Sequence, residues 1–321
     1  MSEGATTETV TDAPPPPFDA DVAVIGAGPA GLSAALNLAR ARRTTLLVDG
    51  NRPRNAATLA SHGFLTRDGI PPLELRRLGR EEFEGYAEAR FHAASVDAVS
   101  LLPGGGFRLT GRGVRGAAAL DATARAVVLA AGLIETLPAL PSIRAWYGTQ
   151  LHSCVECDAY EKSSQPLVLI GESGDLAERA LLISQWSGDL LVCTNGVGVV
   201  TAEQEAALEA RGIRVDRRPI ADVEGAEGRM TGVRFADGTF DERSGGFVRP
   251  EWRASITAID GLALALDADG LVVVDARGRT SVPGVYAAGD VTPPGPEQLI
   301  VAAGEGATVA ATVNRDLLGP L

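Results

Sequence analysis

The strongest structural signal in this chain lies in residues 21–50, DVAVIGAGPAGLSAALNLARARRTTLLVDG. DVAVI is a short run rich in Val and Ile, as is typical of a buried parallel strand. GAGPAG interrupts it, LSAALNLARA continues with helix-forming Ala and Leu, and TTLLVDG has the pattern of a second strand. The order strand, glycine turn, helix, strand predicts the first unit of an α/β nucleotide-binding fold.

The glycine turn has the spacing Gly26-x-Gly28-x-x-Gly31. Gly26 permits a tight turn, Gly28 lets a pyrophosphate approach the backbone, and Gly31 lets the helix pack closely on the strand. Asp49 follows at about the 20-residue offset at which an acid binds a ribose. The glycines alone could serve only a tight turn, but the strand, helix and acid around them favour a dinucleotide with an unphosphorylated ribose, such as FAD or NAD.

The bulk properties exclude several classes of protein. The chain has 321 residues, enough for two domains, with 45% hydrophobic residues and a formal net charge of −12. This charge argues against nucleic acid or an anionic membrane as a partner. Residues 1–18 lack the pattern of a secretory signal and contain four consecutive prolines, which predicts a disordered tail. We expect a cytoplasmic protein without a membrane span.

A second nucleotide-fold unit follows later in the chain. ARAVVLAAGL (residues 124–133) has the pattern of a further strand of the first unit. QPLVLIGESGDLAERALLISQWS (165–187) and DLLVCTNG (189–196) then repeat strand, turn, helix and strand. We expect an α/β protein with two Rossmann-like domains.

Residues 152–160, HSCVECDAY, hold two cysteines separated by two residues and followed by an acid. In a chain with three cysteines this pair favours redox or metal chemistry over a structural disulfide framework. A redox disulfide, a zinc site and inert thiols are the alternatives. Zinc would need His152, Cys154, Cys157 and the distant Cys193, which ends a predicted strand. We therefore favour the redox pair and expect no metal.

Several motifs together resemble the thioredoxin-reductase-like flavoproteins. VAVIGAGPAGLSAA (22–35) is similar to their FAD loop, VVLAAG (127–132) to a conserved turn, and GVYAAGDV (284–291) to their C-terminal flavin motif. PEQLIVAAGEG (296–306) resembles the segment that meets the flavin pyrimidine, and the backbone at Val96 matches the position that holds the adenine. The resemblance implies FAD, with Asp290 on the ribityl chain. The cofactor residues that it implies, together with the glycine motif and Asp49, are Gly26, Gly28, Pro29, Ala30, Gly31, Asp49, Asn55, His62, Val96, Ala131, Gly132, Gly289, Asp290, Gln298 and Leu299.

The resemblance also implies a domain arrangement. The FAD domain would be discontinuous, with residues 19–135 and 262–321, and the domain that carries the cysteines would be inserted as residues 136–261. Cys157 would lie against the flavin, Cys154 would exchange with the substrate, and Asp158 would act as acid and base. His152 would be an ordinary neighbour. A homodimer is the usual assembly of such proteins.

The second nucleotide unit departs from thioredoxin reductases. Ser173 stands where a glycine is expected, and no Lys or Arg occurs between Cys193 and Arg211. An NADPH 2′-phosphate needs basic partners at this place. Either the binding residues have moved, or, as we expect, the domain is degenerate and its nicotinamide site is lost.

The segment from Arg54 to Tyr86, and especially SHGFLTRDG (61–69) within it, resembles a subgroup, the FAD-dependent dithiol oxidases that form disulfides in natural products of the gliotoxin and holomycin kind. Asn55 and His62 would then lie near the flavin, although His62 could equally be structural. The subgroup implies a small-molecule dithiol as substrate and dioxygen as acceptor, giving hydrogen peroxide. The alternatives are a thioredoxin reductase fed by NADPH or ferredoxin, and a non-enzymatic redox sensor that binds FAD.

Overall fold

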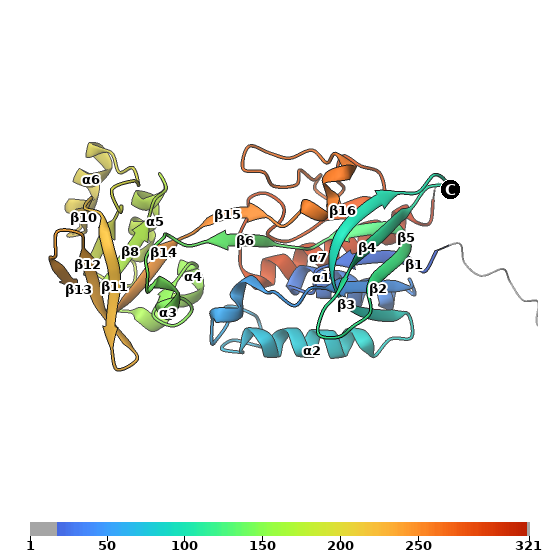
Figure 1. Ribbon diagram of the computed structural model, residues 1–321, viewed down its shortest axis with the longest axis horizontal. Coiled ribbons are helices and arrows are strands. Elements are labelled where there is room, and N and C mark those ends of the chain that lie inside the picture. The colour runs from blue at the N-terminus through green and yellow to red at the C-terminus, as the bar shows by residue number, and fades with distance from the viewer. Residues whose placement is uncertain (1–17, 320–321) are drawn as a thin grey trace, which may run out of the picture.

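The computed structural model describes residues 18–319, which form two α/β domains joined by a narrow connection (Figure 1). The expected fold class is confirmed. The expected N-terminal tail lies outside the described residues except for its last residue. Among the helices of residues 18–319, none is both long and apolar enough to cross a membrane.

The first domain is built on a six-stranded sheet. Its parallel strands follow the order β16-β5-β1-β2-β3, and the outer halves of β3 and β5 turn aside to pair with β4 in antiparallel fashion. Its strands are β1 (Ala20–Ile25), β2 (Thr45–Asp49), β3 (Ala89–Leu101), β4 (Phe107–Gly113), β5 (Leu120–Leu129) and β16 (Val285–Ala287). The apolar run expected for the first strand therefore lies in the middle of the parallel layer, where both faces are covered.

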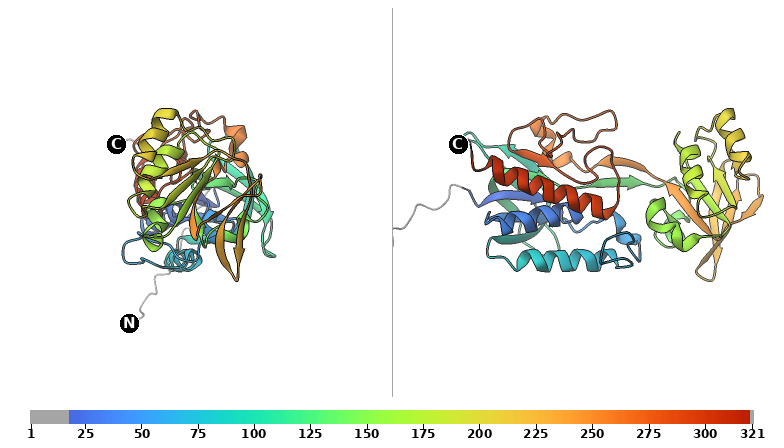
Figure 2. Two further views of the ribbon diagram at one scale, coloured as in Figure 1. Left: turned by 90° about the vertical axis from the view of Figure 1, so that its left-hand side faces the viewer. Right: turned by 180° about the vertical axis from the view of Figure 1, so that it is seen from behind.

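Helices α1 (Pro29–Arg40), α2 (Pro72–Glu84) and α7 (Leu299–Asp316) run side by side across one face of this sheet (Figure 2). Leu38 of α1 and Val313 of α7 are fully buried in the same apolar cluster. Gly306 brings the two helices close together, since a Cβ at this position would lie 2.1 Å from the carbonyl oxygen of Ala30. This contact places the beginning of α7 at the edge of the sheet where α1 also begins.

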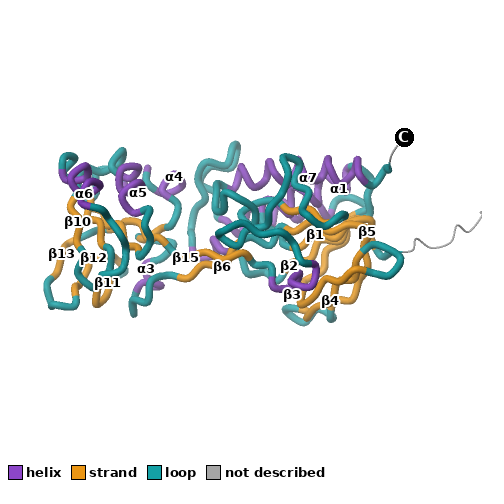
Figure 3. The backbone as a smooth tube through the Cα atoms, turned by 90° about the horizontal axis from the view of Figure 1, so that it is seen from above, coloured by secondary structure: helices purple, strands orange, loops and turns teal. Residues whose placement is uncertain are grey.

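The second domain contains a five-stranded sheet of order β10-β9-β8-β14-β7 beside a three-stranded antiparallel sheet (Figure 3). The strands of the first are β7 (Leu151–His152), β8 (Leu167–Gly171), β9 (Leu190–Cys193), β10 (Arg214–Asp216) and β14 (Gly245–Arg249). Those of the second are β11 (Ile220–Ala226), β12 (Arg229–Phe235) and β13 (Phe240–Glu242). Its helices are α3 (Ile143–Trp146), α4 (Val155–Asp158), α5 (Leu176–Ile183) and α6 (Ala202–Glu209).

The two domains are connected by an antiparallel pair of strands, β6 (Leu133–Thr136) and β15 (Glu251–Ala254). Three short 3₁₀ helices complete the fold: η1 (Arg54–Ala57), η2 (Tyr160–Lys162) and η3 (Thr257–Leu262). Ile259 and Leu262 of η3 pack into the core of the first domain. The chain has therefore re-entered the first domain before residue 262, where the sequence analysis expected the return.

Candidate functional site

The first glycine loop has the geometry of a phosphate-binding turn. Gly26 has a φ of +103°, and a Cβ there would lie 2.3 Å from the carbonyl oxygen of Ala130. A Cβ at Gly31 would lie 1.8 Å from the carbonyl oxygen of Gly26, so α1 packs directly against the turn. Gly28 caps α1 without a side-chain hydrogen bond, and a Cβ there would meet no atom within 4 Å. The free N–H groups at the start of α1 therefore face open space that fits a pyrophosphate.

This space is the first of three cavities that meet at the domain junction, and its volume is about 130 Å³. It runs from the glycine loop past β2 to the start of α7. The predicted cofactor residues that line it are Gly26, Gly28, Pro29, Ala30, Asp49, Asn55, Ala131, Gly132, Gly289, Asp290 and Leu299. Of the others, His62 lines the second cavity and Gln298 the third, whereas Gly31 packs behind the loop and Val96 lies outside these linings.

Two carboxylates in the first cavity are each held by an arginine. Asp49 accepts hydrogen bonds from the backbone of Ala27 at 3.0 Å and from Arg76 at 2.6 Å. Asp290 accepts from Arg54 at 2.6 Å. The sequence analysis identified both acids but not the two arginines that bind them, although both arginines lie in the segment from Arg54 to Tyr86 that it singled out.

Glu305 of α7 fixes the turn that carries Asp290. Its side chain accepts a hydrogen bond from the backbone N–H of Gly289 at 2.6 Å. Burial raises the pKa of the Glu305 carboxyl above its usual value, and the neighbouring Glu297 and Asp290 add to this. Glu305 thus ties α7 to the C-terminal flavin-type motif, a role that the sequence analysis did not anticipate.

Cys154 and Cys157 form a disulfide, with their Cα atoms 5.3 Å apart. Cys154 is the N-cap of α4 and Cys157 lies within this short helix, which the fully buried Val155 anchors in the second domain. Cys193 is buried in β9 and stays a free thiol, and burial raises its pKa. Among residues 18–319, no three His, Cys, Asp or Glu side chains are grouped to hold a metal, and the disulfide leaves neither Cys154 nor Cys157 as a thiolate ligand.

The two cysteines differ in what they face. Both line the second cavity, where they meet Asn55, His62 and Leu299 of the first domain. Cys154 alone also lines the third cavity, which opens on its far side. The first and second cavities share Asn55 and Leu299, so the disulfide lies at one end of the cavity that begins at the glycine loop.

Asp158 and His152 form a buried pair beside the disulfide. Nδ1 of His152 lies 2.8 Å from Oδ1 of Asp158, and Nε2 lies 2.8 Å from the carbonyl oxygen of Thr149. The Nδ1 contact has the distance of an ion pair without the alignment of a hydrogen bond. Because a carbonyl only accepts, Nε2 carries the hydrogen in its contact with Thr149. His152 is therefore not the ordinary neighbour that the sequence analysis assumed.

Ser153, between His152 and Cys154, is held from two sides. Arg179 of α5 donates to its carbonyl oxygen at 2.7 Å, and the hydroxyl of Tyr147 lies 3.0 Å from its Oγ. Burial lowers the pKa of the Arg179 guanidinium, and the positive charge of nearby Arg249 lowers it further. Burial raises the pKa of the Tyr147 phenol. Both side chains fix the backbone that enters the disulfide.

His62 lies across the second cavity from the cysteines. Its Nδ1 is 3.5 Å from Asp68, and its Nε2 is 3.6 Å from Glu161 of the second domain. The ring therefore spans the domain junction. Both readings of His62, as a site residue and as a structural one, fit this position.

The second nucleotide loop is occupied by the chain's own side chains. Ser173 donates to Asp175 at 2.5 Å, and Nε of Arg249 lies 2.7 Å from the other oxygen of Asp175. Gly198, from the loop after β9, presses on the same turn, since a Cβ there would lie 2.9 Å from the carbonyl oxygen of Gly171. Three contacts within the chain therefore hold this turn, whereas a Cβ at Gly174 would meet no atom within 4 Å.

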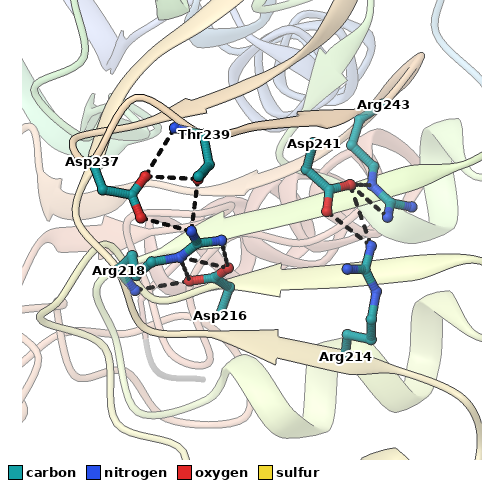
Figure 4. A network of polar contacts seen from close by, with 7 residues as sticks. All are labelled: Arg214, Asp216, Arg218, Asp237, Thr239, Asp241 and Arg243. Carbon is teal, nitrogen blue, oxygen red and sulfur yellow. Dashed lines mark hydrogen bonds and ion pairs between the residues drawn. The ribbon is translucent and has the colours of Figure 1, made fainter.

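Basic residues near this second loop are already paired. Arg217 contacts Glu205 at 2.7 Å, and Arg218 contacts Asp216 at 2.6 Å and Asp237 at 2.8 Å. Figure 4 shows two groups of contacts: Arg218 binds Asp216, Asp237 and Thr239, and Asp241 binds Arg214 and Arg243. These arginines join β10 to the three-stranded sheet, and a 2′-phosphate would have to compete with carboxylates for them.

Comparisons with known proteins agree with this geometry. The family model described as pyridine nucleotide-disulphide oxidoreductase matches residues 20–306. The thioredoxin reductase tcpT of Claviceps purpurea is 30% identical over 84% of this chain and 86% of its own. The thioredoxin reductase of Mycolicibacterium smegmatis is 29% identical over 92% of this chain and 96% of its own.

Two solved structures are similar over most of the chain. TrxB from Bacillus anthracis superposes with a TM-score of 0.86 at 37% identity and covers 93% of this chain and 98% of its own. The crystal structure of HlmI superposes with a TM-score of 0.85 at 39% identity and covers 93% of this chain and 92% of its own.

Proposed function

Because the chain belongs to the pyridine nucleotide-disulphide oxidoreductase family, we propose that it is an FAD-dependent dithiol oxidase. The family makes it a flavin-dependent disulfide oxidoreductase of the thioredoxin-reductase-like kind, with FAD as cofactor. The proposal adds the direction of the reaction. A small-molecule dithiol is converted to an intramolecular disulfide, and dioxygen becomes hydrogen peroxide.

The first cavity fits FAD. The loop at Gly26 and Gly28 would hold the pyrophosphate, Asp49 the adenosine ribose and Asp290 the ribityl chain. Leu299, shared by the first and second cavities, would meet the ring near Cys157. Bound there, FAD would supply a two-electron acceptor for the reduced cysteine pair and a site at which dioxygen could be reduced.

One observation carries the direction of electron flow: the second nucleotide loop places the Asp175 carboxylate at the start of its helix, where Ser173 and Arg249 hold it. An NADPH pyrophosphate needs the free backbone N–H groups of such a loop and the N-terminus of its helix. The Asp175 carboxylate stands there instead, and it would repel a phosphate. A chain that takes no hydride from NADPH must receive its electrons elsewhere, and a dithiol that reaches Cys154 is the donor we infer.

Thiol–disulfide exchange at the cysteines forms the disulfide bond of the substrate. A substrate thiolate attacks Sγ of Cys154, which breaks the Cys154–Cys157 bond and leaves Cys157 as a thiolate. The second substrate thiolate attacks the mixed disulfide, releases Cys154 and closes the substrate's own disulfide. Two electrons then reside on the cysteine pair, and the substrate has given up two protons. Cys154 suits the exchange role because it also lines the open third cavity.

Asp158 and His152 handle these protons. The pair lies beside the disulfide, is screened from water, and lines the second cavity together with both cysteines. A carboxylate and an imidazole at 2.8 Å take up or return a proton without a charge being left alone in a low-dielectric site. We assign Asp158 as the acid and base, and His152 as the residue that holds it in place.

Two resemblances support the subgroup. The segment at residues 61–69 is similar to dithiol oxidases of the gliotoxin and holomycin kind, and the chain is 39% identical to HlmI. A natural-product dithiol is the substrate class that this implies. A homodimer and a cytoplasmic location belong to the same proposal; light scattering on the purified holoprotein tests the dimer.

The test is a comparison of electron donors. Purified holoprotein is mixed without oxygen with a small dithiol or with NADPH, and the flavin absorbance is followed. We expect the dithiol to bleach the flavin within the turnover time, and air to restore it with one hydrogen peroxide formed per disulfide. Bleaching by NADPH alone, at a rate that matches turnover, would overturn the proposal.

A thioredoxin reductase is the second candidate, because relatives such as those of Claviceps purpurea and Mycolicibacterium smegmatis carry that name. NADPH or reduced ferredoxin would then be the donor and thioredoxin the acceptor. Anaerobic reduction of thioredoxin by the protein with either donor, at a rate above that of dithiol oxidation, would favour this function.

A further inference from the structure

Lys162 is the single lysine among the 29 lysine and arginine residues of this chain. Every other basic position is an arginine, whose guanidinium stays protonated in proteins. A lysine is therefore the one basic side chain here that can release its proton within an accessible pH range. It lies at the end of η2, four residues after Asp158.

The lysine is buried although it carries a charged group, since only 8% of its surface is exposed. Its Nζ donates a long hydrogen bond of 3.5 Å to the carbonyl oxygen of Thr149, the same oxygen that contacts His152. Among residues 18–319, no carboxylate lies within 4.0 Å of Nζ to form an ion pair. The ammonium group thus has only one long hydrogen bond to replace the water that it loses on burial.

The charged groups around Lys162 come from each neighbouring element. Asp158 comes from α4, His152 from β7 and Glu161 from η2, where Glu161 is exposed and contacts His62. Burial lowers the pKa of the Lys162 amine, while Asp158 and Glu161 act in the opposite direction. The protonation of the amine therefore depends on how much negative charge its surroundings hold.

Reduction of the disulfide changes that charge. In the proposed reaction, two electrons arrive on the cysteines, Cys157 becomes a thiolate, and two protons leave the substrate. Cys157 is half-buried, and a partly buried thiolate without a cationic partner is costly where the local dielectric constant is low. One substrate proton stays on Cys154 as a thiol, and the other must go to a nearby base or to solvent.

We propose that Lys162 is a positioning residue for this redox centre: its amine binds a proton more tightly when the disulfide is reduced and releases it when the disulfide re-forms. The inference rests on the proposed function for its direction, but not for its measurement. The His152–Asp158 pair connects the two groups, because it lines the second cavity with both cysteines and His152 contacts the same Thr149 carbonyl oxygen as Lys162. The amine then has one pKa in the oxidised protein and a higher one in the reduced protein. At pH values between these two, reduction of the disulfide takes up one proton more than the cysteines alone require.

A single lysine makes the test direct. Holoprotein labelled with ¹³C-lysine gives one lysine side-chain resonance, which is titrated in the oxidised protein and in protein reduced anaerobically with dithionite. We expect a midpoint below the usual 10.5 in the oxidised protein and a midpoint higher by about one pH unit or more after reduction. Equal midpoints in the two states would overturn the inference.

Two variants separate charge from proton release. Lys162→Arg keeps a positive charge that cannot be released, and Lys162→Met fills similar space without charge. We expect both variants to bind FAD. The equilibrium between the protein disulfide and dithiothreitol is measured at a series of pH values by counting alkylated cysteines. We expect its pH profile to lose one ionisation in both variants. A Lys162→Arg profile identical to that of the original protein would contradict the inference.

Dithionite and the equilibrium with dithiothreitol report on the cysteines and the lysine whatever the natural electron donor is. Rapid flavin bleaching by NADPH would therefore defeat the proposed function while leaving these lysine measurements interpretable. Equal lysine midpoints with normal dithiol oxidation would defeat only the present inference. The two failures are distinguishable in the same preparation.

Discussion

His152 and Asp158 are six residues apart in the chain, yet Nδ1 of the first lies 2.8 Å from Oδ1 of the second, beside the disulfide. The parallel pairing of β7 with β14 fixes His152, and the buried helix α4 fixes Asp158. Each residue is 8% exposed. The pair is therefore largely kept from bulk water, and it lines the same cavity as both cysteines.

Asp158→Asn removes the group that exchanges the proton. We expect the rate of flavin reduction by a dithiol to fall by about 10²-fold, in the range found for loss of a general acid or base. His152→Gln should lower the same rate less, by about 10-fold, and should shift its pH profile, because it acts through Asp158. Anaerobic stopped-flow absorbance measures both. An Asp158→Asn rate equal to that of the original protein would exclude the assigned role.

The three cysteines should respond differently to substitution. Cys154→Ser and Cys157→Ser each leave one redox sulfur, so we expect dithiol oxidation to be abolished with FAD still bound. Cys193→Ala is the matched control, because Cys193 is buried in β9 away from the cavities. It should keep its activity and lose only about 1 kcal/mol of stability. Oxygen consumption with a dithiol gives the comparison.

Two glycines of one motif should fail in different ways. A Cβ at Gly28 meets no atom within 4 Å, so Gly28→Val fills the pyrophosphate space and should give a folded protein without flavin. A Cβ at Gly31 would lie 1.8 Å from a carbonyl oxygen, so Gly31→Val should prevent α1 from packing. Circular dichroism and the flavin spectrum of the purified proteins separate the outcomes. Full flavin content in Gly28→Val would place the cofactor elsewhere.

Lys162→Met should stabilise the protein at neutral pH. Burial lowers the pKa of the Lys162 amine in the folded state below its unfolded value of 10.5. The folded protein therefore bears the cost of a buried ammonium at all pH values below its folded pKa, and this cost disappears as pH rises from there through 10.5. We expect a gain of about 1 kcal/mol at pH 7.

The pH dependence of that gain is the control. Urea unfolding of both proteins at a series of pH values should show the difference shrinking toward pH 10.5. A gain that stays constant across this range would mean that packing of the methionine, and not removal of the charge, is responsible.

The local patterns of the sequence were sufficient for the fold and the main site. Alternating buried strands, the motif at Gly26, Gly28 and Gly31, and the pair Cys154 and Cys157 are short-range signals, because each depends on a few consecutive residues and on the backbone they favour. The resemblance added FAD and Asp290. All of these could be read from the chain without coordinates.

Only the tertiary structure brought together residues that the chain keeps apart. Arg54 meets Asp290 across 236 positions of sequence, and Arg249 reaches Asp175 at the second nucleotide loop. No local pattern marks such contacts, because they depend on the close packing of separate elements. The burial of Lys162 beside Asp158 is of the same kind: sequence shows that this lysine is the only one, but only packing removes its ammonium from water.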